Sequence, residues 1–175
     1  MAALLDPPLG PDDHVAGDAS APLELVMYGD FECPYCAAAQ SILARVRSRL
    51  GDRLRFAFRH FPLDELHPHA RNAAEAAEAA AAQGAFWAMH DAMFSARGRL
   101  EDRDLVAHAA GLGLDADRVA AELDSHAHLA RVERDLSYAR RAALAGTPAF
   151  YVNGRLFEGT YDARSLIEAL EAPVA

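Results

Sequence analysis

Residues 30–36 read Asp30-Phe31-Glu32-Cys33-Pro34-Tyr35-Cys36 and contain both cysteines of this 175-residue chain. The short apolar stretch Leu23–Tyr28 comes just before them, and we interpret it as a strand that Gly29 closes. After them, apolar residues recur every three or four positions over 34–50, which predicts a helix. The cysteine pair therefore lies where a strand ends and a helix begins.

Pro34 occupies the expected first position of that helix, where a proline loses no hydrogen bond. Cys33 then falls at or near the N-cap, where free N–H groups and the helix dipole stabilise negative charge. We therefore expect the pKa of Cys33 to lie below the ordinary thiol value of about 8.5. Cys36 follows one turn later on a neighbouring part of the helix surface, so the two can form a disulfide with little backbone movement.

This spacing suits thiol–disulfide exchange, in which Cys33 attacks a substrate disulfide and Cys36 resolves the resulting mixed disulfide. Such cycling calls for an exposed outer thiol and a shielded inner one. Two alternatives stay open, a zinc site and two incidental buried cysteines. Zinc needs about four ligands, and no second cysteine pair is present, although His67, His69 or His90 could contribute. We assign no metal ligand.

The rest of the chain predicts a mixed α/β protein. Residues 54–61 alternate largely between apolar and polar side chains, which predicts a second strand. Helical patterns then fill nearly all of 64–145. Residues 149–157 are interpreted as a hairpin around the type I′ turn signal Asn153-Gly154, and 161–170 as a final helix.

Composition excludes several classes of function. The net charge is −9, which argues against binding to nucleic acid or to an anionic membrane surface. All 17 basic residues are Arg, so Schiff-base and phosphate-loop lysines are excluded. No stretch approaches the ~20 apolar residues of a membrane span. The first residues show no secretory signal pattern, so we expect a cytoplasmic protein, in which paired cysteines tend to be catalytic, redox-sensing or metal-binding.

Three further motifs stand in order along the chain. They are Phe58-Arg59-His60-Phe61-Pro62-Leu63, the segment Gln83–Asp91, and Gly146-Thr147-Pro148-Ala149-Phe150. Together with the cysteine motif, they resemble the DsbA-like disulfide oxidoreductases over about residues 14–170.

The resemblance implies an α/β thioredoxin fold with an inserted all-helical domain. On that basis the thioredoxin-like domain comprises 14–61 and 146–175, and the helical insertion comprises 62–145. Residues 1–13, rich in Pro and Gly, are expected to form a flexible N-terminal tail. We interpret His60 as structural, and His67 and His69 as capping or solvated groups.

The resemblance also implies that Pro148 is cis and lies beside the cysteine pair. Thr147, the residue before it, would then offer its backbone to an extended substrate peptide. One position departs from the family pattern. An acid that commonly lies six residues before the first cysteine is replaced here by Met27, so we hypothesise that Cys36 is deprotonated slowly, by water or by another acid such as Asp30 or Glu158.

The dipeptide between the cysteines, Pro34-Tyr35, is expected to tune the redox poise. Pro-Tyr is also the glutaredoxin-type dipeptide, and glutaredoxins lie at about −200 to −230 mV. Asp30 and Glu32 flank Cys33, and their negative charges should disfavour its thiolate form.

We therefore predict a thiol–disulfide oxidoreductase that exchanges disulfides with protein or peptide substrates, with the direction of electron flow left open. No cofactor is required, because electrons come from glutathione or a thioredoxin-type protein. No nucleic acid or membrane partner is expected, and a monomer is favoured. The alternatives are a glutathione-dependent isomerase or transferase, against which Cys36 counts, a zinc- or iron–sulfur-binding protein, and a holdase.

Overall fold

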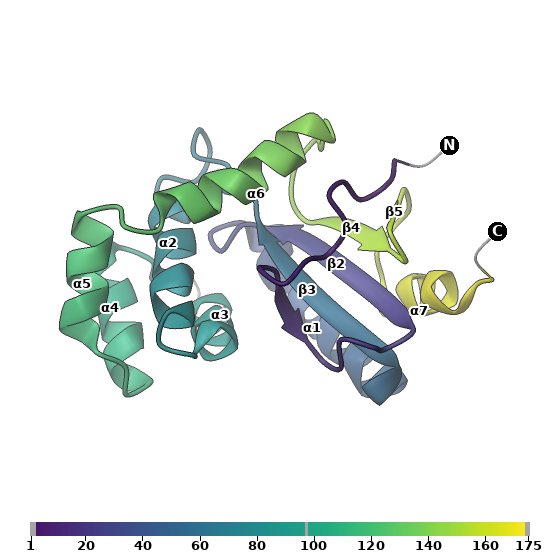
Figure 1. Cartoon of the computed structure of the whole chain (residues 1–175), viewed down its shortest axis with the longest axis horizontal. Coiled ribbons are helices and arrows are strands. Elements are labelled where there is room, and N and C mark those ends of the chain that lie inside the picture. The colour runs from purple at the N-terminus through teal and green to yellow at the C-terminus, as the bar shows by residue number, and fades with distance from the viewer. Residues whose placement is uncertain (1–2, 97, 174–175) are drawn as a thin grey trace.

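The computed structural model describes residues 3–96 and 98–173. Its centre is a sheet of order β1-β3-β2-β4-β5 (Figure 1). The strands are β1 (His14–Ala16), β2 (Leu23–Gly29), β3 (Leu54–His60), β4 (Ala149–Val152) and β5 (Arg155–Leu156). β2 and β3 run parallel, and every other neighbouring pair is antiparallel. The sheet is therefore mixed, and the loops after β2 and β3 leave it at the same edge.

The two faces of the sheet carry different cores. Leu25 and Met27 of β2 belong to a cluster with α1 (Pro34–Leu50) and α7 (Ala163–Glu171). The alternate residues Val26 and Tyr28 pack instead with residues of α6 (Leu129–Arg141). Successive side chains of a strand point to opposite faces, so the unbroken apolar stretch of β2 serves both cores. Each fully buried large apolar side chain contributes roughly 1.5–3 kcal/mol.

The helical region lies between β3 and β4 in the sequence. It comprises α2 (Ala70–Ala81), α3 (Phe86–Ser95), α4 (Asp102–Gly111), α5 (Ala116–Asp124) and α6. Figure 1 shows α2 to α5 gathered beside the sheet and α6 running from them back toward it. The alanines of α2 are buried almost throughout, because small side chains let neighbouring helices approach closely. A short 3-10 turn, η1 (Gly51–Arg53), follows α1. No helix of the described residues is long and apolar enough to cross a membrane.

The hairpin between β4 and β5 confirms the turn predicted from the sequence. Asn153 and Gly154 both have positive φ, 47° and 77°, as a type I′ turn requires. The Asn153 side chain also accepts a hydrogen bond from the Glu24 N–H at 3.0 Å and donates to Leu170 O at 2.9 Å. This turn residue therefore ties the hairpin to β2 and α7.

The N-terminal segment differs from the loose tail that the sequence suggested. The Leu5 N–H donates to Gly154 O at 2.8 Å, and the Leu5 side chain is buried. Arg59 of β3 is fully buried, and its guanidinium donates to both carboxylate oxygens of Asp13 at 2.9 and 3.0 Å and to Pro7 O at 3.0 Å. A buried guanidinium needs acceptors for its five N–H groups. The N-terminal segment supplies several of them, which holds it against the sheet.

Candidate active site

The cysteine motif forms the loop from β2 into α1. Cys33 is the N-cap of α1 with φ −69° and ψ 121°, and Pro34 is at the start of the helix. The Cys33 N–H points to Asp30, whose carbonyl and carboxylate oxygens both lie at 3.2 Å. The sequence-based prediction of a cysteine at the N-cap of this helix is confirmed.

The loop before β4 lies against this helix end. The Thr147–Pro148 peptide bond is cis, and the Cys33 thiol donates to Thr147 O at 3.5 Å. β4 pairs with β2 from Tyr28 to Leu25, so the two loops leave adjacent strands at one end of the sheet. The fold thereby places Thr147, 114 residues away along the chain, against the first cysteine.

The two cysteines differ less in solvent exposure than the sequence predicts. Cys36 is 0% exposed, but Cys33 is only 3% exposed, so the expectation of an openly exposed outer thiol is wrong in degree. The Thr147 carbonyl oxygen, 3.5 Å away, is one of the atoms that cover the Cys33 sulfur. Tyr35, between the cysteines, is 67% exposed and marks the accessible side of the loop. Both cysteines are free thiols in this structure.

The pKa values of the two thiols are driven apart. A hydrogen bond from Cys36 and the N–H groups of Tyr35 and Cys36 outweigh burial and lower the pKa of Cys33 to about 5. Burial, and then the neighbouring Cys33, raise the pKa of Cys36 far above the usual thiol range. Since the thiolate is the reactive form of a cysteine, the lowered pKa favours ionisation of Cys33 at neutral pH. The raised pKa favours the protonated form of Cys36.

The two acids beside Cys33 are engaged by hydrogen-bond donors. Asp30 is 2% exposed, and its carboxylate accepts from the N–H groups of Glu32 at 2.7 Å and Leu63 at 2.9 Å, and from His67 Nδ1 at 2.7 Å. Glu32 accepts from the His69 N–H at 2.7 Å. The sequence-based interpretation of His67 as a capping or solvated group missed its pairing with Asp30.

Met27 is fully buried in the core against α1 and carries no acid toward Cys36. The contact from Asp30 to Cys36 comes from its backbone, whose N–H lies 3.5 Å from the Cys36 sulfur. The Asp30 carboxylate is occupied by its hydrogen bonds to Glu32, Cys33, Leu63 and His67. Among the described residues, no hydrogen bond joins Glu158 to Cys36.

Among the residues that the structure describes, one group of side chains away from the cysteines has the composition of a metal site. The ligand atoms of His14, His60 and Glu78 lie within 4.8 Å of one another. Both histidine Nε2 atoms lie at hydrogen-bond distance from the same Glu78 oxygen, 2.8 and 2.7 Å, and Arg131 Nε lies 3.8 Å from it. Because a guanidinium already balances the carboxylate, we interpret the group as a hydrogen-bonded link between β1, β3 and α2.

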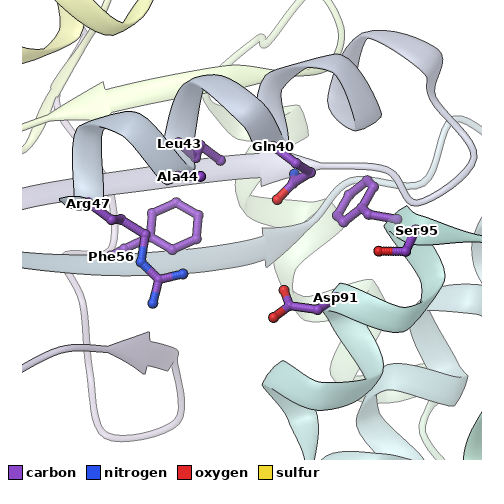
Figure 2. A pocket seen from close by; sticks show the side chains of 8 residues that line it. Gln40, Leu43, Ala44, Arg47, Phe56, Asp91 and Ser95 are labelled. Atoms are coloured by element: carbon purple, nitrogen blue, oxygen red, sulfur yellow. The ribbon is translucent and has the colours of Figure 1, made fainter.

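A hollow of about 370 Å³ opens between α1 and α3 (Figure 2). Arg47 of α1 and Asp91 of α3 project toward it from opposite sides. Its lining also includes Gln40, whose amide donates to Cys36 O at 3.1 Å. Neither cysteine lines the hollow, so we place the candidate active site at the cysteine loop.

Comparisons with known proteins agree with this fold. The thioredoxin family model matches residues 10–172. A thioredoxin-like oxidoreductase from Silicibacter pomeroyi superposes with a TM-score of 0.82 and 25% identity over 93% of this chain and 92% of that one. DsbA2 from Pseudomonas aeruginosa superposes with a TM-score of 0.74 and 26% identity over 94% of this chain and 96% of that one.

The similar curated proteins are longer. A protein named Na⁺/H⁺ antiporter NhaA from Herminiimonas arsenicoxydans is 47% identical over 173 residues, which is 98% of this chain and 27% of that protein. One named Na⁺/H⁺ antiporter NhaA 1 from Salinispora arenicola is 46% identical over 95% of this chain and 25% of that protein. The chain spans about a quarter of the length of these relatives.

Proposed function

This chain belongs to the thioredoxin family and has the DsbA-like form of its fold, and we propose that it is a protein thiol–disulfide oxidoreductase. The observation that carries the proposal is the pair of thiols at the start of α1. One is an N-cap thiol whose pKa is lowered to about 5, and the other is a fully buried thiol whose pKa is raised. A cis-proline loop beside them supplies a backbone carbonyl next to the reacting sulfur.

The exchange runs in two balanced steps. The Cys33 thiolate attacks one sulfur of a substrate disulfide, a new S–S bond forms, and the other substrate sulfur leaves as a thiolate that takes up a proton. Cys36 then gives up its proton and attacks the Cys33 sulfur, which expels the second substrate thiolate. The substrate ends as a dithiol and the protein as a Cys33–Cys36 disulfide. Run in reverse, the same steps oxidise a substrate dithiol.

Thr147 is the proposed docking point for the substrate peptide. Its carbonyl oxygen lies beside the Cys33 sulfur, and an extended peptide that pairs with this backbone would align its own cysteine with Cys33. Tyr35, the exposed member of the Pro34-Tyr35 dipeptide, borders the same surface. Glutathione or a thioredoxin-type protein would restore the resting state.

The deciding measurement is the reduction potential of the Cys33–Cys36 pair, by equilibration against glutathione redox buffers. We expect a reversible two-electron couple at about −200 to −230 mV, the range of glutaredoxins. A Cys36→Ser variant should accumulate a mixed disulfide with a model peptide, and Cys33→Ser should form none. Absence of any reversible couple would contradict the proposal, and metal or cluster binding by the pair would then take its place.

A second proposal concerns where in the cell the protein acts. The 47% identity to part of a protein named an antiporter favours association with a membrane transporter, whereas the sequence alone predicts a cytoplasmic protein without a membrane partner. Cell fractionation combined with the Cys36→Ser trap distinguishes the two. Mixed disulfides recovered from the membrane fraction support the association, and recovery from the cytosol alone supports the prediction from the sequence.

A further inference from the structure

The loop after β3 delivers a histidine to the cysteine motif. β2 and β3 are parallel and end in register, Gly29 opposite His60, so the residues that follow them meet at one edge of the sheet. There His67 Nδ1 lies 2.7 Å from one oxygen of Asp30, while the other oxygen of Asp30 lies 3.2 Å from the Cys33 N–H. A single buried carboxylate therefore joins the His67 ring to the backbone N–H of Cys33.

The negative charges around the Asp30 carboxylate favour a positively charged neighbour. Asp30 is buried, Glu32 lies two residues further on, and the lowered pKa of Cys33 favours its thiolate, so three negative groups lie in one loop at neutral pH. The Pro34-Tyr35 dipeptide brings no positive charge. Burial disfavours the charged form of His67, but its hydrogen bond to Asp30 and the charges of Asp30, Cys33 and Glu32 prevail and raise the pKa of His67.

We propose that His67, held in place by Asp30, is a positioning residue that supplies the positive charge which stabilises the Cys33 thiolate. This inference rests on the proposed function, because it concerns the same thiol. The loop after β3 then helps to set the reduction potential of the Cys33–Cys36 pair. The positive charge of His67 also explains how two acids can flank the nucleophile without suppressing its ionisation.

The first test changes the charge. His67→Gln should raise the pKa of Cys33 by about one unit, read from the pH dependence of thiolate absorbance in the reduced protein. That shift is a tenfold change in proton affinity, and it should make the reduction potential about 30 mV more negative. His69→Gln is the matched control. It removes a histidine from the same loop, where only the backbone N–H of residue 69 contacts Glu32, and it should leave the pKa of Cys33 unchanged.

The second test needs no change at position 67. Coupling between two sites is reciprocal, so loss of the thiolate should lower the pKa of His67 by the same amount, about one unit. The imidazole resonances of His67 are titrated by NMR in the reduced protein, in the disulfide form and in the Cys33→Ser variant. A merely structural His67, bound only to Asp30, would titrate identically in all three.

The inference is overturned if His67 titrates alike in the three forms or if His67→Gln leaves the pKa of Cys33 unchanged. Neither readout requires turnover, and the Cys33→Ser comparison does not require a disulfide to form. Failure of the proposed function, seen as the lack of a reversible couple, is therefore distinguishable from failure of this inference.

Discussion

At the scale of single residues, the site depends on the contrast between its two thiols. The donors that lower the pKa of Cys33 are the Cys36 thiol and backbone N–H groups at the start of α1. The Cys36 thiol is fully buried, and the Asp30 N–H lies 3.5 Å from its sulfur. This contrast fits the proposed roles of Cys33 as the attacking thiol and Cys36 as the resolving thiol, although neither is openly exposed.

The first prediction concerns the pH dependence of Cys33. The rate of alkylation at Cys33 should rise with pH and level off above the pKa of about 5, because only the thiolate reacts. Cys36→Ala removes the strongest of the stabilising donors and should move the midpoint upward, toward the ordinary thiol value. Alkylation by iodoacetamide, followed by mass spectrometry from pH 4 to about 9, measures both. A midpoint that stays near the ordinary thiol value of about 8.5 in the unaltered protein would contradict the assignment.

The second prediction concerns Met27. A Glu at this position would present a carboxylate to the buried side of Cys36, where Met27 is now fully buried. Met27→Glu should speed release of the mixed disulfide, because the acid can accept the Cys36 proton. It should also cost a few kcal/mol of stability, because an acid is buried in an apolar core. Met27→Gln has the same shape without the acid and should be destabilised without any gain in rate; equal release rates for the two variants would refute the idea.

At the scale of elements, the sequence was informative where one local pattern determines the backbone. The α1 start at Pro34, the strand β3 and the Asn153-Gly154 turn were all predicted, because capping, strand patterning and positive φ are local properties. The short strand β1 was missed, since its three residues carry no pattern and pair only in the context of β3.

The missed role of His67 has a similar origin. Its partner Asp30 lies 37 residues earlier, so no local pattern joins the two. The signal that could have found the pair is topological. If β2 and β3 are parallel neighbours, the segments after them share an edge of the sheet. The sequence predicted both strands, but it did not predict which residues after them meet.

The third prediction concerns the N-terminal segment as an element. Asp13→Asn should destabilise the protein by about 3–5 kcal/mol, because it leaves the buried Arg59 guanidinium without its charge partner. Chemical denaturation measures the change. Asp12→Asn is the adjacent control, since Asp12 is 78% exposed in its pair with Arg134, and it should cost at most about 1 kcal/mol.

The Asp13–Arg59 pair also predicts how the stability of the protein depends on pH. Although burial opposes it, the hydrogen bond from Arg59 lowers the pKa of Asp13 below 3.8. A depressed folded-state pKa contributes stability above the unfolded value, and this contribution is lost as the pH falls through the folded value. The gap in stability between the unaltered protein and Asp13→Asn should therefore persist at neutral pH and shrink below pH 3.8.

At the scale of the whole molecule, the sheet and the helical region must hold each other so that the loops around the cysteines stay in register. Asp30 receives donors from the loop that leads from β3 into α2, so a shift of α2 against the sheet would disturb the site. The link formed by His14, His60 and Glu78 opposes such a shift, because it joins β1 and β3 to α2 through one buried carboxylate oxygen.

The fourth prediction tests that link. Glu78→Gln keeps the shape but removes the charge that both histidines and Arg131 surround, so it should destabilise the protein by about 1–3 kcal/mol. Amide hydrogen exchange should accelerate in α2 and β3 together, because the link is shared between them. The control is Glu133→Gln. Glu133 lies on α6, is half-exposed and pairs with Arg71, so this variant should change stability by at most about 1 kcal/mol. Acceleration confined to α2 would mean that the cluster braces one helix rather than joining the helical region to the sheet.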